Sequence, residues 1–154
     1  MEDGERLSLP EDLLLIAVDP YTGVLRVPDR IPHGVAGAIL AKLIAEGRMW
    51  PMRAGRVYAR DTEPTGDALL DQLVAEVAEP RDANGRPRGR DAHRWLREIG
   101  LRATGPYMER LTARGVLGVL ENPAPRGPFR DIRYPLLAPD TASLAFRQVD
   151  RSEE

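Results

Sequence analysis

Apolar residues along this chain recur mainly three and four positions apart, a spacing that predicts α-helices rather than β-strands. The first helix is expected within residues 7–18, where Ser8 supplies an N-cap and Pro10 falls in the first turn. Further helices are expected at residues 32–47, with Gly47 as the C-cap, and at 68–79, 91–100 and 105–114. The pattern therefore predicts a mainly α-helical protein.

Two short hairpins are expected between these helices. The stretch "RMWPMRAGRVYARD" predicts one that turns at Ala54 and Gly55, and residues 115–137 predict a second with a long tip. In both places a helix, a glycine and a hairpin follow one another, which is the outline of a winged helix used twice. The predicted fold is thus a compact helical domain with two winged-helix-like helix/β-hairpin units.

The helix within "PTGDALLDQLVAEV" begins after several polar residues, which could form either a helix cap or a ligand site. Either Thr65 or Asp67 can act as the N-cap, because a short side-chain oxygen accepts a backbone N–H that the first turn leaves unpaired. A helix N-terminus also binds anions, but Asp67 places a carboxylate there that competes with any phosphate. We therefore expect a well-capped core helix rather than a ligand site.

The length of 154 residues suits one domain, expected over residues 1–140 and followed by a polar tail at 141–154. Residues 80–91 are rich in Arg, Gly and Pro, which predicts a flexible loop. The N-terminus lacks a basic segment and a cleavage site, and the longest apolar run is only residues 13–18. A cytoplasmic protein is therefore expected.

Composition removes several kinds of chemistry. The chain has no cysteine and only two histidines, so disulfides, thiol nucleophiles, cysteine-ligated zinc and three-histidine metal sites are excluded. The nucleophile elbow, the phosphate loop, the dinucleotide-binding glycine pattern and the His-Glu-x-x-His motif are all missing. We therefore expect a non-enzymatic protein that needs no cofactor and no metal.

Charge is distributed unevenly, although the formal net charge is only -2. Residues 1–20 hold six acidic residues against one arginine, whereas residues 81–102 hold seven arginines against three acidic residues. The second segment is a candidate anion-facing surface, and the alternative is an ordinary solvated charged loop. Lipid phosphates and DNA are both conceivable partners, but the net acidity makes nucleic acid unlikely.

Four segments in this order resemble the Golgi phosphoprotein 3 family (the GPP34 domain) in its bacterial form: "RLSLPEDLLLIAVDPYTG", "HGVAGAILAKLIAEGR", "PTGDALLDQLVAEV" and "ERLTARGVL". The resemblance covers residues 6–137. It implies a mostly helical domain that binds phosphatidylinositol-4-phosphate in a basic pocket and sits peripherally on membranes. It also implies further helices after "YPLLAP" that this chain is expected to lack. Either the chain is a short member of the family, or the missing helices leave an apolar face for a partner or a second copy to cover.

The chain departs from the family at the head-group pocket. The family's arginine on the second helix is Ala36 here, its tryptophan falls on Val27, and of a later arginine pair only Arg102 has a counterpart. Nearby arginines are therefore the candidates for phosphate contact, with two tryptophans at the membrane interface and a core position as the alternative for both. The candidates are Arg30, Arg90, Arg94, Arg97 and Arg102 for the head group, and Trp95 and Trp50 for the interface.

These observations together predict non-enzymatic binding of anionic phospholipid head groups by a peripheral membrane or adaptor-like protein. The head group implied by the resemblance is phosphatidylinositol-4-phosphate. The alternative is a winged-helix module for nucleic acid or for protein interaction.

Overall fold

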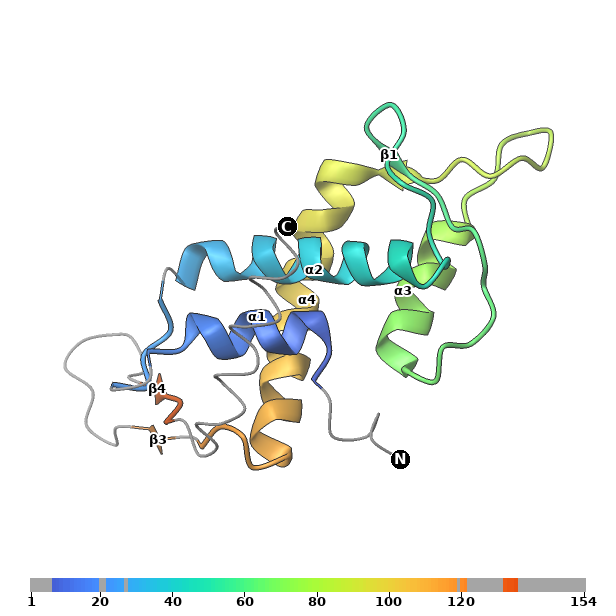
Figure 1. The fold of residues 1–154 in the computed structure, drawn as a ribbon. Helices are drawn as coiled ribbons and strands as arrows, with labels where there is room; N and C mark the ends of the chain where they lie inside the picture. Colours follow the sequence, from blue (N-terminus) through green and yellow to red (C-terminus); the bar gives the residue numbers. More distant parts are fainter. Residues whose placement is uncertain (1–6, 20–21, 27, 119, 122–131, 136–154) are drawn as a thin grey trace. The chain divides into compact units, whose positions relative to one another are not determined.

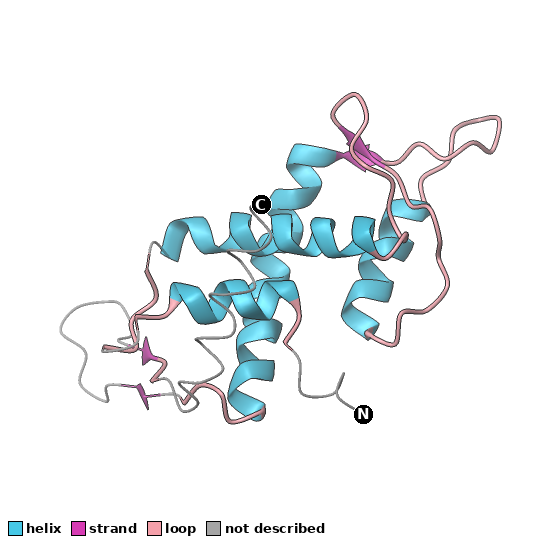
Figure 2. Ribbon diagram, viewed as in Figure 1, coloured by secondary structure: helices cyan, strands magenta, loops and turns pink. Residues whose placement is uncertain are grey.

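The computed structural model describes residues 7–19, 22–26, 28–118, 120–121 and 132–135 (Figure 1). The described helices are α1 (Leu9–Ala17), the short 3-10 helix η2 (Pro28–Arg30), α2 (Ile31–Ala45), α3 (Ala68–Ala78) and α4 (Ala92–Ala113). The strands, each of two residues, are β1 (Arg56–Val57), β2 (Arg90–Asp91), β3 (Leu120–Glu121) and β4 (Ile132–Arg133) (Figure 2). The predicted mainly α-helical fold is confirmed.

The chain divides into two compact units. Unit 1 comprises Met1–Ile31 and Thr104–Glu154, and unit 2 comprises Pro32–Ala103. Helix α4 contributes to both, since the boundary falls between Ala103 and Thr104. The expected end of the domain at residue 140 and the expected polar tail lie outside the described residues and stay predictions.

Unit 1 contains helix α1 and the C-terminal part of α4. Ser8 is the N-cap of α1, as predicted, and its N–H and hydroxyl donate to Oε1 of Glu11, at 3.4 and 2.7 Å. Glu11 is almost fully buried, and its Oε2 lies 3.4 Å from Nη1 of Arg114 near the end of α4. A buried carboxylate needs such a partner, so this pair ties two segments that are 103 residues apart.

The second predicted hairpin also belongs to unit 1. Strands β3 and β4 pair antiparallel, with Leu120 opposite Arg133 and Glu121 opposite Ile132. The backbone N–H of Tyr134 donates to the carbonyl oxygen of Gly23 at 2.6 Å, which fastens this hairpin to the turn after α1. The predicted long tip at 122–131 lies outside the described residues.

Unit 2 is built around the buried faces of α2, α3 and the first part of α4. Its larger buried side chains are Val35, Ile39, Leu43, Met49, Val57, Leu70, Leu73, Val74, Val77, Trp95 and Ile99. The helical members recur at spacings of three and four residues, as an amphipathic helix requires.

The N-terminus of α3 is capped by side chains of the residues around it. The carboxylate of Asp67 accepts the backbone N–H groups of Leu69 and Leu70, at 3.0 and 3.4 Å. Thr65 donates its N–H and its hydroxyl to Asp71, each at 2.7 Å. Asp67 is therefore the N-cap, and the expected capped core helix is confirmed at this position.

The first predicted hairpin is confirmed as well. It turns at Ala54 and Gly55, whose φ angles of 50° and 71° are both left-handed, and the backbones of Arg53 and Arg56 exchange hydrogen bonds of 3.0 and 3.1 Å across the turn. We call residues 49–59 the first hairpin. Its strand β1 also pairs antiparallel with β2, which follows α3 in the sequence. The winged-helix description of the two helix/hairpin units is not confirmed and stays a prediction.

The prediction of separate helices at 91–100 and 105–114 is wrong, because α4 is one helix of 22 residues with Pro106 inside it. Proline removes one backbone hydrogen bond and disfavours the preceding turn, which is why a break was expected. Buried residues nevertheless continue through the proline at intervals of four: Trp95, Ile99, Ala103, Tyr107 and Leu111. Burial of this continuous stripe offsets the lost hydrogen bond.

A close backbone approach within unit 2 involves Gly100 of α4. A Cβ atom at this position would overlap the carbonyl group of Pro32, at the start of α2. We expect Gly100→Ala to lower the free energy of unfolding by about 2 kcal/mol, because overpacking of this kind outweighs the roughly 1 kcal/mol by which alanine favours a helix. Urea unfolding followed by circular dichroism measures the change.

The matched control is Gly37→Ala in α2, where an added Cβ would meet nothing within 4 Å. This variant should be as stable as the wild type or more stable by up to about 1 kcal/mol. Equal stabilities for the two alanine variants would contradict the close approach at Gly100.

Candidate anion-binding site

A cavity of about 410 Å³ in unit 2 is lined in part by arginines of the basic segment that the sequence indicated. We call it the basic cavity, and its lining residues are Arg56, Pro80, Arg88, Gly89, Arg90, Asp91, Arg94, Trp95 and Glu98. Four arginines face two carboxylates there, which leaves a formal excess of two positive charges. The volume lies within the range of small-molecule sites.

The loop between α3 and β2 holds one of these arginines, Arg88, and is followed directly by Arg90 in β2. The carboxylate of Asp82 accepts the backbone N–H groups of Asn84 and Arg86, at 2.8 and 2.9 Å, and the N–H of Arg88 donates to the carbonyl of Pro80 at 2.9 Å. These bonds fold the loop back on itself and lead the chain into β2. The flexibility predicted for residues 80–91 stays a prediction.

Gly89 allows β2 to approach β1. Its φ of +62° is left-handed, and a Cβ there would overlap the carbonyl of Val57 and the ring of Tyr58. Any side chain would therefore push the strands apart. Through this pairing Arg56, from the first hairpin, reaches the arginines that follow α3.

Two arginines of the basic cavity are held by neutral acceptors. Arg56 donates from Nε to the carbonyl of Arg88 at 2.9 Å and from Nη2 to the carbonyl of Gly89 at 3.2 Å. Arg90 donates from Nε to the carbonyl of Glu76 at 2.7 Å. The hydrogen bonds to these uncharged acceptors orient both guanidinium groups, and the charge of Arg90 also interacts with the carboxylate of Glu76.

The other two arginines are more open to solvent. Arg94 is 80% exposed and lies 3.3 Å from Glu98, an exposed pair that contributes little to stability. Arg88 is exposed, and within the described residues its guanidinium has no hydrogen bond or ion pair. The carboxylate of Asp91 accepts the backbone N–H of Arg94 at 2.9 Å, so it also serves the first turn of α4.

Trp95 lies at the wall of the basic cavity. It is only 2% exposed, so the prediction that it lies at a membrane interface is wrong and the core alternative holds: the ring belongs to the buried stripe of α4. Its indole Nε1 is buried and has no hydrogen-bond partner within the described part of the chain.

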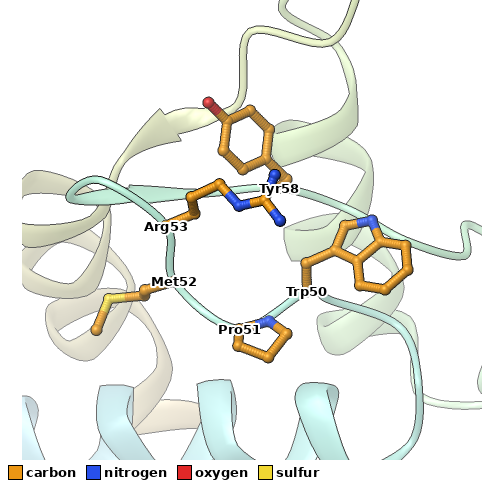
Figure 3. Close-up of a pocket in the computed structure, with 5 residues that line it drawn as sticks. All are labelled: Trp50, Pro51, Met52, Arg53 and Tyr58. Atoms are coloured by element: carbon orange, nitrogen blue, oxygen red, sulfur yellow. The ribbon is translucent and has the colours of Figure 1, made fainter.

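A second hollow, of about 550 Å³, lies on the first hairpin and is lined by Trp50, Pro51, Met52, Arg53 and Tyr58 (Figure 3). Figure 3 shows the Arg53 guanidinium extended between Tyr58 and Trp50, with Met52 pointing outward from the loop. Trp50 is 48% and Met52 54% exposed. The guanidinium of Arg60 stacks 4.3 Å from the centroid of the Trp50 ring. Trp50 is thus exposed, as an interface role requires, and that role stays a prediction.

The described residues show neither of two other kinds of site. None of their helices is both long enough and apolar enough to cross a membrane. No group of three or more His, Cys, Asp or Glu side chains among them is arranged to hold a metal ion.

The model of the family described as Golgi phosphoprotein 3 (GPP34) matches residues 9–152. The chain belongs to the GPP34 family. A search of curated proteins finds no match.

The positions that correspond to the family's head-group residues are occupied differently in this GPP34 protein. Ala36 is fully buried in α2 and has no polar group, and Val27 lies outside the described residues. Arg102 is committed to Glu76: Nη1 and Nη2 lie 2.9 and 2.8 Å from its two carboxylate oxygens. This bidentate contact holds the pKa of Glu76 below its ordinary value and raises that of Arg102.

The structure divides the arginines predicted from sequence into two groups. Arg90 and Arg94 line the basic cavity, whereas Arg97 and Arg102 do not. Arg30 is exposed at the end of η2 and belongs to unit 1. Sequence reasoning did not select two of the lining arginines. Arg88 lay within the basic segment, but nothing in the sequence linked it to Arg56, which joins it through the β1–β2 pairing.

The Glu76–Arg102 pair makes the stability of this GPP34 protein depend on pH. Because the pKa of Glu76 is lowered in the folded state, the pair contributes stability above the ordinary glutamate pKa and loses it as the pH falls through the folded value. We expect Glu76→Gln to cost about 1 kcal/mol at pH 7, a modest amount since the pair is partly exposed, and less in acid.

Urea unfolding of both proteins at neutral and acidic pH measures this difference. The control is Glu79→Gln at the end of the same helix, where the carboxylate is exposed and the change should stay within about 0.5 kcal/mol at either pH. A Glu76→Gln effect that is the same at both pH values would show that the charge of Glu76 is not its cause.

Proposed function

We propose that this GPP34 protein binds anionic phospholipid head groups at a membrane surface, as a non-enzymatic peripheral or adaptor-like protein. Phosphatidylinositol-4-phosphate is the head group that the family resemblance implies. The observation that carries the proposal is the first hairpin, which exposes Trp50 and Met52 beside several arginines.

The hairpin has the composition of an interfacial element. Residues 48–60 contain four arginines and no acidic residue. Tryptophan favours the head-group level of a bilayer because it has an apolar ring and an N–H donor, and methionine adds apolar area. Each arginine close to an anionic bilayer adds about 1 kcal/mol. A hairpin of this kind binds an anionic bilayer by apolar burial and by charge together.

The basic cavity belongs to the same unit as this hairpin and shares a strand with it, since Arg56 of β1 lines the cavity. Arginine suits phosphate better than lysine does, because its planar fork donates two parallel hydrogen bonds. Unit 2 therefore carries both an apolar contact for the bilayer and charged donors for phosphate.

Vesicle flotation tests the proposed function. The protein is mixed with vesicles of phosphatidylcholine alone, with 20% phosphatidylserine, or with 5% phosphatidylinositol-4-phosphate. Flotation with the anionic vesicles and not with the neutral ones is expected, and a preference for phosphatidylinositol-4-phosphate would extend the family's head group to this chain. Absence from all three floated fractions would overturn the proposal. Binding to a labelled DNA duplex under the same conditions would then favour the nucleic-acid alternative.

The hairpin variant Trp50→Ser with Met52→Ser should lower the partition coefficient on anionic vesicles at least tenfold. The reason is the loss of about 2 kcal/mol of apolar burial, and 1.4 kcal/mol already corresponds to a factor of ten. Leu101→Ser removes another exposed apolar side chain from the same unit, at 69% exposure, and should leave partition unchanged. Equal effects of the two variants would rule out the hairpin as the contact.

A further inference from the structure

We infer that the basic cavity is a binding site for a phosphate monoester, at a position that differs from the head-group pocket implied by the family resemblance. That the monoester belongs to a lipid head group rests on the proposed function. Binding in the cavity itself can be tested with soluble ligands. Charge, donor geometry and the side chains at the family positions each support this inference.

The charge of the cavity fits a dianion better than a monoanion. Its four arginines and two carboxylates leave an excess of two positive charges. A phosphate monoester carries about 1.5 to 2 negative charges at neutral pH, whereas the phosphodiester of an ordinary phospholipid carries about one. A monoester therefore balances the cavity, and the excess favours it over lipids that lack a terminal phosphate.

The arginines at the wall are already oriented. Arg56 and Arg90 are fixed through bonds to the carbonyls of Arg88, Gly89 and Glu76, and a guanidinium has further N–H groups beyond the one or two that these bonds use. Donors that are held before the ligand arrives lose less conformational entropy on binding. The exposed Arg88 and Arg94 then close on the ligand from the solvent side.

The indole N–H of Trp95 is buried and has no acceptor among the described residues. A buried donor without an acceptor costs about 1 to 3 kcal/mol, so structures seldom retain one. Trp95 lines the basic cavity, so a ligand bound there would change the surroundings of its side chain.

The family positions themselves offer little to a phosphate in this chain. Ala36 has no donor, and both terminal nitrogens of Arg102 already contact the carboxylate of Glu76. Arg56 and Arg90, whose hydrogen bonds go to backbone carbonyls, lie in the basic cavity instead.

Calorimetric titration with inositol 1,4-bisphosphate tests the site in solution. Arg88→Ala with Arg94→Ala removes two cavity arginines and should weaken binding at least tenfold. The control, Arg86→Ala with Arg97→Ala, changes the net charge equally, in the same loop and the same helix, but outside the cavity. It should change affinity less than threefold. Equal losses in the two variants, or no binding by the wild type, would overturn the inference.

Fluorescence reports the site directly, because the chain has only two tryptophans. In a Trp50→Phe background the emission comes from Trp95 alone. Inositol 1,4-bisphosphate should shift this emission in a saturable way that Arg88→Ala with Arg94→Ala removes. Glycerophosphocholine, a phosphodiester, should leave it unchanged. An emission unaffected by the monoester would contradict the placement of the ligand at Trp95.

Inorganic phosphate distinguishes the sources of the monoester. Stronger binding of inositol 1,4-bisphosphate than of phosphate indicates a lipid head group, and equal binding indicates a site for free phosphate. The two proposals also fail separately. If flotation is impaired equally by Arg88→Ala with Arg94→Ala and by Arg86→Ala with Arg97→Ala, the proposed membrane binding would stand and the cavity would be rejected as the binding site. Saturable binding of the monoester without flotation would retain the cavity and reject the membrane function.

Discussion

The pairing of β1 with β2 is the constraint on which both candidate sites depend. It involves only two residues on each strand, and it is possible because Gly89 leaves room for the carbonyl of Val57 and the ring of Tyr58. On one side of this contact the first hairpin extends to its exposed tip. On the other side Arg56 joins the arginines that follow α3. A short strand pair thus determines where the exposed apolar residues of the first hairpin and the basic cavity lie within one unit.

The arginines of this chain differ in function because they differ in acceptor. Arg102 and Arg114 contact carboxylates, and these contacts join helices or segments of one unit. Arg56 and Arg90 donate to backbone carbonyls and retain their charge. Arginine allows both uses because its guanidinium stays protonated in any environment. The number of arginines in the sequence is therefore a poor measure of the capacity to bind anions. What matters is which group accepts the hydrogen bonds of each arginine.

Features governed by local rules could be predicted from the sequence. The caps at Ser8 and Asp67 and the turn at Ala54 and Gly55 each depend on a few neighbouring residues, and all three are confirmed. Features that depend on distant contacts could not. The continuity of α4 through Pro106 needed the buried stripe on both sides of it.

The same distinction applies to the candidate site. The sequence indicated the basic segment that holds Arg90 and Arg94, because charge is visible in composition. It left open for both tryptophans whether they lie in the core or at an interface, and the structure shows that Trp95 is buried while Trp50 is exposed. It also could not bring Arg56 to Arg88, because that contact requires the chain to return after α3. The net charge of -2 would suggest weak repulsion from anionic surfaces, yet charges are screened beyond about 8 Å at physiological salt. At contact the local excess in the basic cavity therefore counts for more than the acidic segments elsewhere, so the net acidity of the protein does not argue against the proposed anion binding.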